Sequence, residues 1–251
     1  MAPATDFVAI FDADTVPRPD ALSLLAGALA DPSVGAAGGY PEPGNSAATV
    51  TSRYAAIERW TLHLVTLAGK DRLNMNPAAI GALCLIRRCA LDEIGGFPVG
   101  ATAEDIQISL LLNRHGWRTR SVIEAVSRED VPELLADFRA QRQRWSRGLE
   151  QTRGAGSTIE DHFVAAGYFD RIVMIAALPL AWWGTLSWHF LGFYVATPVA
   201  GLLVAVARAQ PPAVLATLAS IPVMAVADLG VTIASLLERG PIRWARRRPV
   251  K

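Results

Sequence analysis

Three short polar motifs follow one another along the chain and contain the residue types that could do chemistry. They are Asp12-Ala13-Asp14, Glu104-Asp105 and Gln141-x-x-Arg144-Trp145. The first motif comes directly after an apolar run, Phe7–Phe11, that is typical of a strand. A turn at a strand's end can direct two carboxylates at one point, and hard divalent cations bind carboxylates together with substrate phosphates. The motif therefore fits a metal–diphosphate site, and it equally fits an Asp-rich turn that binds nothing.

The second motif opens a helix that we predict over Thr102–His115. Acids are favoured in a first helical turn by the dipole, and Thr102-x-x-Asp105 is close to a capping box. A carboxylate at this place could also act as general base towards a hydroxyl nucleophile. The sequence alone favours the cap, and the two roles are compatible because they use different atoms of one turn.

The third motif lies on an amphipathic helix that we predict over Pro132–Thr152. Its Gln141, Arg144 and Trp145 share one face with Gly148, because they stand at positions i, i+3, i+4 and i+7. A guanidinium suits a diphosphate, an indole can stack on a sugar ring, and an amide can bind hydroxyls. Apolar residues would anchor the helix beside this face: Leu134, Leu135, Phe138 and Leu149. In the alternative interpretation Trp145 lies in the core and the helix exposes a solvated face of Arg139, Arg142 and Arg147.

Composition limits the class of protein. The chain has 251 residues, of which 51% are hydrophobic, enough for one sizeable core. Lys and Arg number 24 against 23 Asp and Glu, so no basic excess favours nucleic acid as a partner. Cys84 and Cys89, the two cysteines, have neither redox nor zinc spacing. We expect both to be reduced packing residues, which suits a cytoplasmic compartment.

Alternating strand and helix patterns over residues 1–155 predict an α/β layer fold. The predicted strands are Phe7–Phe11, Val34–Tyr40 and Ile80–Arg87. The predicted helices, besides the two above, run from Pro19 to Ala30, from the Pro41–Ser46 loop to about Ala68, and over Ala90–Ile94.

The rest of the chain has a different character. Residues 156–171 are expected to be an interfacial linker and residues 238–251 a basic tail. Between them, Ile172–Ala207 carries no Asp, Glu, Lys or Arg, and Pro212–Leu237 carries one acid, Asp228. A membrane span needs about 20 apolar residues, so residues 172–237 predict two or three membrane helices. Two spans would place the basic tail and the catalytic part on the cytoplasmic side of the cell membrane. A pair of buried core helices is the alternative.

The ordered motifs resemble those of the family 2 membrane glycosyltransferases of the cellulose-synthase-like type. Four blocks carry the resemblance over about residues 6–150: FDADTVPRPDAL, GALCLIRRCALDEIGGF, AEDIQISLLLNRHGW and QRQRWSRG. The approach Glu129-Asp130-Val131-Pro132 is most similar to the glucomannan- and cellulose-synthase branches. The resemblance implies a GT-A (Rossmann-like) domain followed by transmembrane helices.

The resemblance also implies roles for the motif residues. Asp12 and Asp14 would bind a divalent cation (Mg or Mn) and the diphosphate of a UDP- or GDP-sugar. Asp105 would be the base for the hydroxyl of a glycan acceptor, with Glu104 in support and inversion at the transferred sugar. The acceptor and pyrophosphate would be held by Gln141, Arg144 and Trp145. Ala103 stands where the family usually has Thr, which is not the base.

Members of this family begin with a nucleotide-binding half, whereas here Asp6 stands near the start. We therefore expect about 60 residues of βα structure to be absent, an exposed sheet edge, and a need for a complementing N-terminal half. A catalytically inactive fragment or membrane partner subunit is a second hypothesis. A third is a haloacid-dehalogenase-like phosphatase with Asp12 as nucleophile, although Lys70 is the one lysine before the C-terminal residue.

Overall fold

The computed structural model describes residues 6–79, 81–100, 103–152 and 221–237, with a few isolated positions between 184 and 207. Its contacts divide the chain into two units. We call residues 6–44 and 66–130 the sheet unit, and the described residues of 45–65 and 131–237 the helical unit. The predicted linker 156–171, the stretch 208–220 and the tail 238–251 lie outside the described residues, as does most of 172–207.

The sheet unit contains one mixed five-stranded sheet in the order β1-β4-β3-β5-β2. Its strands are β1 (Phe7–Phe11), β2 (Val16–Pro17), β3 (Val34–Pro43), β4 (Leu83–Arg87) and β5 (Arg118–Glu129). Its helices are α1 (Ala21–Ala28), α3 (Ala68–Arg72), α4 (Arg88–Glu93) and α5 (Glu104–Arg114). Strands β1, β3 and β5 run in one direction, and β4 and β2 run against them. The predicted α/β class is confirmed.

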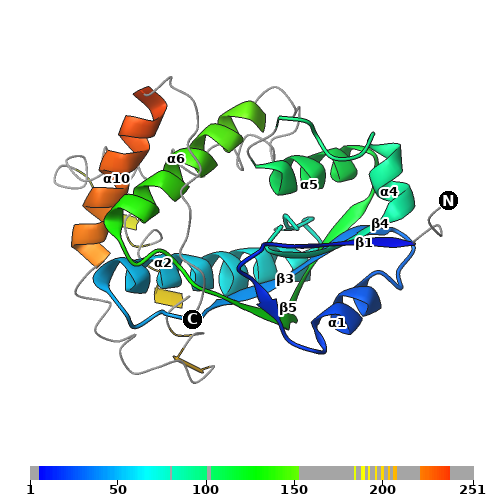
Figure 1. Ribbon diagram of the computed structural model, residues 1–251, viewed down its shortest axis with the longest axis horizontal. Coiled ribbons are helices and arrows are strands. Elements are labelled where there is room, and N and C mark those ends of the chain that lie inside the picture. Colours follow the sequence, from blue (N-terminus) through cyan, green and yellow to red (C-terminus); the bar gives the residue numbers. More distant parts are fainter. Residues whose placement is uncertain are drawn as a thin grey trace. The chain divides into compact units, whose positions relative to one another are not determined.

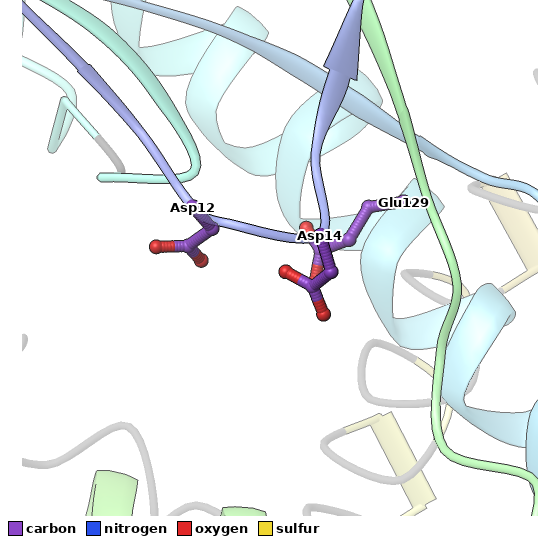
Figure 2. Close-up of side chains that lie close together, drawn as sticks. All are labelled: Asp12, Asp14 and Glu129. Carbon is purple, nitrogen blue, oxygen red and sulfur yellow. The ribbon is translucent and has the colours of Figure 1, made fainter. Parts of the chain in front are cut away.

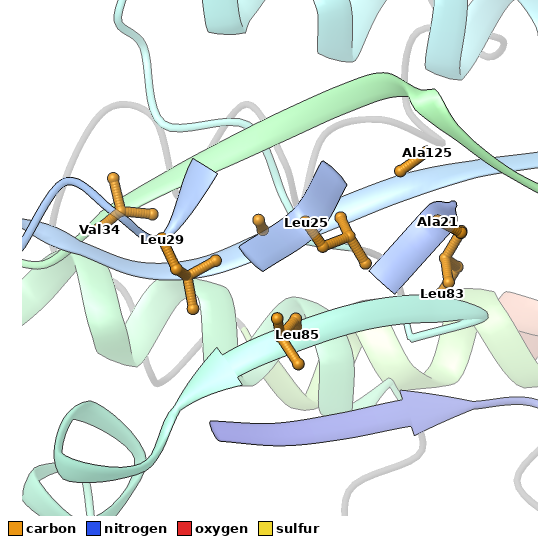
Figure 3. Packing of buried hydrophobic residues seen from close by; sticks show 8 residues of the cluster. Ala21, Leu25, Leu29, Val34, Leu83, Leu85 and Ala125 are labelled. Atoms are coloured by element: carbon orange, nitrogen blue, oxygen red, sulfur yellow. The ribbon is translucent and has the colours of Figure 1, made fainter. Parts of the chain in front are cut away.

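Helices cover both faces of the sheet, with α1 on one side and α4 and α5 on the other (Figure 1). The alternation of side chains along a strand explains this arrangement. In β4, Leu83 and Leu85 pack against α1 (Figure 3), whereas Cys84 and Ile86 pack in the cluster of α4 and α5. Leu25 of α1 is fully buried, and truncation of such a residue to Ala costs about 2–5 kcal/mol.

The sheet leaves no room for a side chain at Gly39 in β3. A Cβ atom there would lie 2.3 Å from Leu83 Cδ2 and 2.5 Å from the carbonyl oxygen of Ala125. The second contact is with backbone, which cannot rotate away. Gly39 is therefore required by close packing at the centre of the sheet.

Several predicted boundaries change in the structure. Strand β3 continues to Pro43, through part of the predicted Pro41–Ser46 loop, because it pairs in parallel with β5. Strand β5 was not predicted from the sequence. Polar and apolar side chains alternate in only part of Arg118–Glu129, so the segment lacks the regular pattern of a strand. Cys84 is buried as expected, but the packing prediction is wrong for Cys89, which is exposed because it falls on α4 and not on β4.

The helical unit is built from α2 (Val50–Trp60), α6 (Leu135–Thr152) and α10 (Ile221–Leu237). Thr49 starts α2 with a capping box shared with Ser52. A π-helical turn, Thr61–Leu67, follows α2 and leads into α3. Within the described part of the chain, no helix combines the length and apolar character that a membrane crossing requires.

The core of the helical unit is small and partly aromatic. Phe138 of α6 is fully buried and meets Tyr54 of α2 edge to face, with ring centroids 5.9 Å apart. Met224 of α10 joins the same cluster. The prediction that Leu134 and Leu135 anchor α6 is wrong, since both are at least half exposed. The helix is held by Phe138 and by the polar contacts described below.

Candidate metal and catalytic site

Three carboxylates gather in the sheet unit: those of Asp12, Asp14 and Glu129 (Figure 2). One oxygen from each lies within 4.8 Å of the others. Asp12 is exposed, Asp14 is half-buried and Glu129 is buried. Such an all-oxygen set is the donor chemistry that Mg²⁺ and Mn²⁺ prefer. The donor atoms of these residues and their spacing fit a divalent cation.

Strand pairing explains why distant residues meet here. The Asp12 carbonyl accepts a hydrogen bond from the Thr15 amide at 3.0 Å, which closes the turn between β1 and β2. Val16 of β2 then pairs with Arg128 of β5, so the turn lies beside the end of β5 and Glu129. Since β1 and β5 run in the same direction, all three acids lie at the carboxyl ends of strands, where open α/β sheets bind ligands.

Sequence reasoning predicted the aspartate pair and missed Glu129 as a possible ligand. Glu129 entered only as part of the Glu-Asp-Val-Pro segment before α6. Glu129 was missed because β5 was not predicted. Without that strand, no argument placed Glu129 at the same edge of the sheet as Asp12. An acid at the C-terminal end of a strand parallel to β1 is the signal that could have found it.

The structure places Asp105 in the first turn of α5, half-buried, beside the exposed Glu104. Its Oδ2 accepts a hydrogen bond from the Gly81 amide at 3.0 Å, and its Oδ1 accepts one from Ile106 at 2.8 Å. The predicted capping role is wrong, because the N-cap is Ala103 and makes no side-chain cap. The carboxylate is held towards the segment before β4.

The register of the sheet relates Asp105 to the aspartate pair. Phe11 of β1 pairs with Leu83 of β4, and the two strands are antiparallel. Asp12 follows Phe11, and Gly81 stands just before Leu83, so both belong to the same end of this strand pair. The hydrogen bond from the Gly81 amide therefore holds the Asp105 carboxylate at the edge of the sheet where the carboxylates of Asp12 and Asp14 lie.

The local field of Asp105 is visible in Cys84. Burial, and to a smaller extent the nearby negative charge of Asp105, raises the pKa of the Cys84 thiol to about 12. The Cys84 thiol is thus a protonated packing group at neutral pH. It is not a nucleophile.

The third motif lies on α6 of the helical unit. Gln141 is buried, whereas Arg144 and Trp145 are half-buried, so the latter two retain accessible surface. The alternative of a solvated arginine face is wrong for Arg142, which is 5% exposed. Arg142 forms an ion pair with Glu58 of α2, and its Nε lies 3.7 Å from Asp228 Oδ1 on α10. The acid inside the apolar segment is therefore part of a buried charge cluster.

Comparison with known proteins bears on what these residues do. The family model described as glycosyl transferase family group 2 matches residues 7–229, which is most of the chain. The chain belongs to this family. The match includes all three motifs, and it leaves the phosphatase interpretation of Asp12 without support.

Individual relatives agree with the family. An N-acetylglucosaminyltransferase of Rhizobium leguminosarum bv. viciae is 30% identical over 151 residues, which cover 57% of this chain and 35% of the relative. A probable glucomannan 4-beta-mannosyltransferase of Oryza sativa subsp. japonica is 27% identical over 147 residues, with 57% and 26% covered. The chain spans about a third of the length of the curated relatives it matches.

A solved structure shares the fold of this glycosyl transferase family member. The mannosyltransferase of Pyrobaculum calidifontis, in complex with GDP-mannose and Mn²⁺, superposes with a TM-score of 0.54 at 23% identity. The superposition covers 93% of this chain and 62% of the other. The fold is thus that of a GT-A-like glycosyltransferase, as the motifs predicted.

Proposed function

We propose that the protein transfers a sugar from a nucleotide-diphosphate donor, a UDP- or GDP-sugar, to a hydroxyl of a glycan acceptor, with inversion of the anomeric centre. The main observation behind this proposal is the cluster of three carboxylates, from Asp12, Asp14 and Glu129, at the carboxyl ends of β1 and β5. A family of glycosyltransferases and a fold shared with a GDP-mannose-bound enzyme support it.

Asp12, Asp14 and Glu129 would hold a divalent cation (Mg or Mn), which would offset negative charge on the diphosphate as it departs. The exposed position of Asp12 and the half-exposed one of Asp14 suit residues that meet a bound donor. Glu129, buried at the strand end, would fix the position of the site relative to the sheet.

Asp105 would act as the general base. It would accept the proton from the acceptor hydroxyl while that oxygen forms a bond to the anomeric carbon and the bond to the diphosphate breaks. A single displacement of this kind inverts the anomeric centre. The hydrogen bonds from Gly81 and Ile106 support the assignment, because they hold the carboxylate in one orientation.

The motif residues of α6 would bind the other reacting parts. The Arg144 guanidinium would stabilise the diphosphate, the Trp145 indole would stack on the acceptor sugar, and the Gln141 amide would bind hydroxyls. Their partial exposure supports this for Arg144 and Trp145, whereas Gln141 is buried.

The finer assignment is to the cellulose-synthase-like branch, at the cytoplasmic face of the cell membrane, in contact with lipid. The relatives named for glucomannan and cellulose synthesis support the branch. The uncharged run Ile172–Ala207 supports a membrane region.

The test is transfer by the full chain with UDP-glucose, UDP-N-acetylglucosamine or GDP-mannose, an oligosaccharide acceptor, and Mn²⁺ or Mg²⁺. We expect one donor to be consumed in a metal-dependent way, and NMR of the product to show the inverted anomer. Donor binding without turnover would favour the inactive-partner hypothesis. Failure to bind any of these donors would contradict the proposal.

The metal site is tested with Glu129→Gln against Glu124→Gln, an exposed glutamate of the same strand. We expect Glu129→Gln to weaken Mn²⁺ binding about tenfold in calorimetry, because one carboxylate oxygen becomes a neutral amide. Glu124→Gln should bind Mn²⁺ as the wild type does. Equal affinities for both variants would remove Glu129 from the site.

A further inference from the structure

Arg142, a residue inside the third motif with no assigned role, is among the most buried arginines that the structure describes. Its side chain is 6% exposed and lies within α6, next to Gln141. A buried cation needs compensating charge, since desolvation of an ion costs several kcal/mol. The compensation comes from two other helices: Glu58 of α2 and the fully buried Asp228 of α10.

The two carboxylates contact two different nitrogens of the guanidinium. The ion pair with Glu58 uses Nη2, and Asp228 Oδ1 lies 3.7 Å from Nε. Asp228 is itself held, because the Tyr54 hydroxyl donates a hydrogen bond to its Oδ2 at 3.2 Å. A planar guanidinium contacted at two of its nitrogens has little freedom to rotate.

The same guanidinium lies over two aromatic rings. Its central carbon lies 4.7 Å from the ring centroid of Phe138 and 4.9 Å from that of Trp145. Helical spacing brings all three together, since Phe138 precedes Arg142 by one turn and Trp145 follows it by three residues. Phe138 is fixed in the core, whereas Trp145 is only half-buried. The arginine therefore connects a rigid ring to a partly exposed one.

We propose that Arg142 is a positioning residue: held by Glu58 and Asp228, it fixes the indole of Trp145 in the orientation that stacks on the acceptor sugar. The inference rests on the proposed function for the role of Trp145, but the placement of the ring does not. A positive charge alone would not hold the Trp145 indole in this orientation, because a lysine has no flat group on which the indole can pack.

The placement is tested without substrate, by ¹⁹F NMR of the full chain labelled with 5-fluorotryptophan. The resonance that is lost in Trp145→Phe identifies Trp145. We expect Arg142→Lys, which keeps the charge, to shift this resonance, and Arg139→Lys, at an exposed position of the same helix, to leave it unchanged. A Trp145 resonance that Arg142→Lys does not move overturns the inference. If Arg142→Lys does not fold, Asp228→Asn decides by the same shift, because it removes one anchor of the guanidinium.

Kinetics then separate positioning from general destabilisation. Arg142→Lys should raise the acceptor KM about fivefold, the size of a cation–π contribution, with donor KM and kcat nearly unchanged. Equal losses in donor and acceptor parameters would indicate a merely structural role and would contradict the proposal. If the wild type transfers no sugar, the proposed function fails, while the ¹⁹F shift still decides the placement of Trp145.

Discussion

In the sheet unit, the residues that we propose for the chemistry lie just after strand β1, at the end of β5 and in the first turn of α5, outside the apolar core. Asp12 and Glu104 are exposed, and Asp14 and Asp105 are half-buried. In the helical unit the motif helix is held from inside by charged groups, with Arg142 and Asp228 both buried. If the proposed roles are right, function and stability should therefore be separable in the first unit and coupled in the second. The predictions below run from the largest expected effect to the smallest.

Asp105→Asn should reduce sugar transfer by about 10²–10⁴-fold, because the acceptor hydroxyl loses its base. The thermal midpoint should stay near that of the wild type, since the side chain is not part of the apolar core. Transfer rate and differential scanning fluorimetry check the two parts. Glu124→Gln, an exposed acid of the same unit with no proposed role, is the control and should keep most activity. Near-normal turnover in Asp105→Asn would exclude it as the base.

Asp228→Ala should lower the free energy of unfolding by about 3 kcal/mol, because it leaves Arg142 with one anchor and the Tyr54 hydroxyl without its acceptor on Asp228. Urea unfolding of the full chain measures this. Val226→Ala changes an exposed residue of the same helix and should stay within about 0.5 kcal/mol. If the two variants were equally stable, the buried cluster would not couple the motif helix to stability.

Gly39→Ala should destabilise the protein by about 1–3 kcal/mol, because the added methyl group meets the Ala125 carbonyl. Gly27→Ala on α1 has open space around the new carbon and should stabilise the helix by about 0.5–1 kcal/mol. Opposite signs in urea unfolding would confirm that the sheet centre is closely packed. A neutral Gly39→Ala would contradict that packing.

Cys84 gives the smallest effect at neutral pH, because its contribution to stability changes only at alkaline pH. Its pKa is raised to about 12 in the folded protein from an ordinary value near 9.0. Its contribution to stability is therefore present below pH 9 and is lost as pH rises towards 12, because only the unfolded chain ionises in that range. Cys84→Ala should flatten this part of the profile. At neutral pH iodoacetamide should modify exposed Cys89 alone, and mass spectrometry would show a second adduct only after denaturation.

Much of the sheet unit could be predicted from the sequence, because local patterns determine it. The run Phe7–Phe11 and the aspartates after it were recognised as a strand and a turn, and the structure confirms both elements. What failed was β5 and, with it, Glu129. The polar residues of β5 are tolerated because pairing with β3 stabilises the strand, and such pairing between distant segments leaves no local signal.

The helical unit was harder to predict from the sequence, for a related reason. The helical period of residues 132–152 correctly predicted α6 and its shared face. It could not show that Arg142 turns inward, because a buried arginine depends on partners from other helices, here Glu58 and Asp228. By ordinary composition rules an arginine in a polar helix belongs in solvent.

The pairing of β3 with β5 has a consequence for how the protein forms. These two strands carry the central parallel contact of the sheet, and β5 is the last strand of the unit to be synthesised. Closing a loop of that length carries an entropic cost that only the finished pairing offsets. The aspartates near the start of the chain therefore meet Glu129 only when this closure is complete. Assembly of the candidate metal site should accordingly be a late step on the folding pathway, slower than formation of the helices.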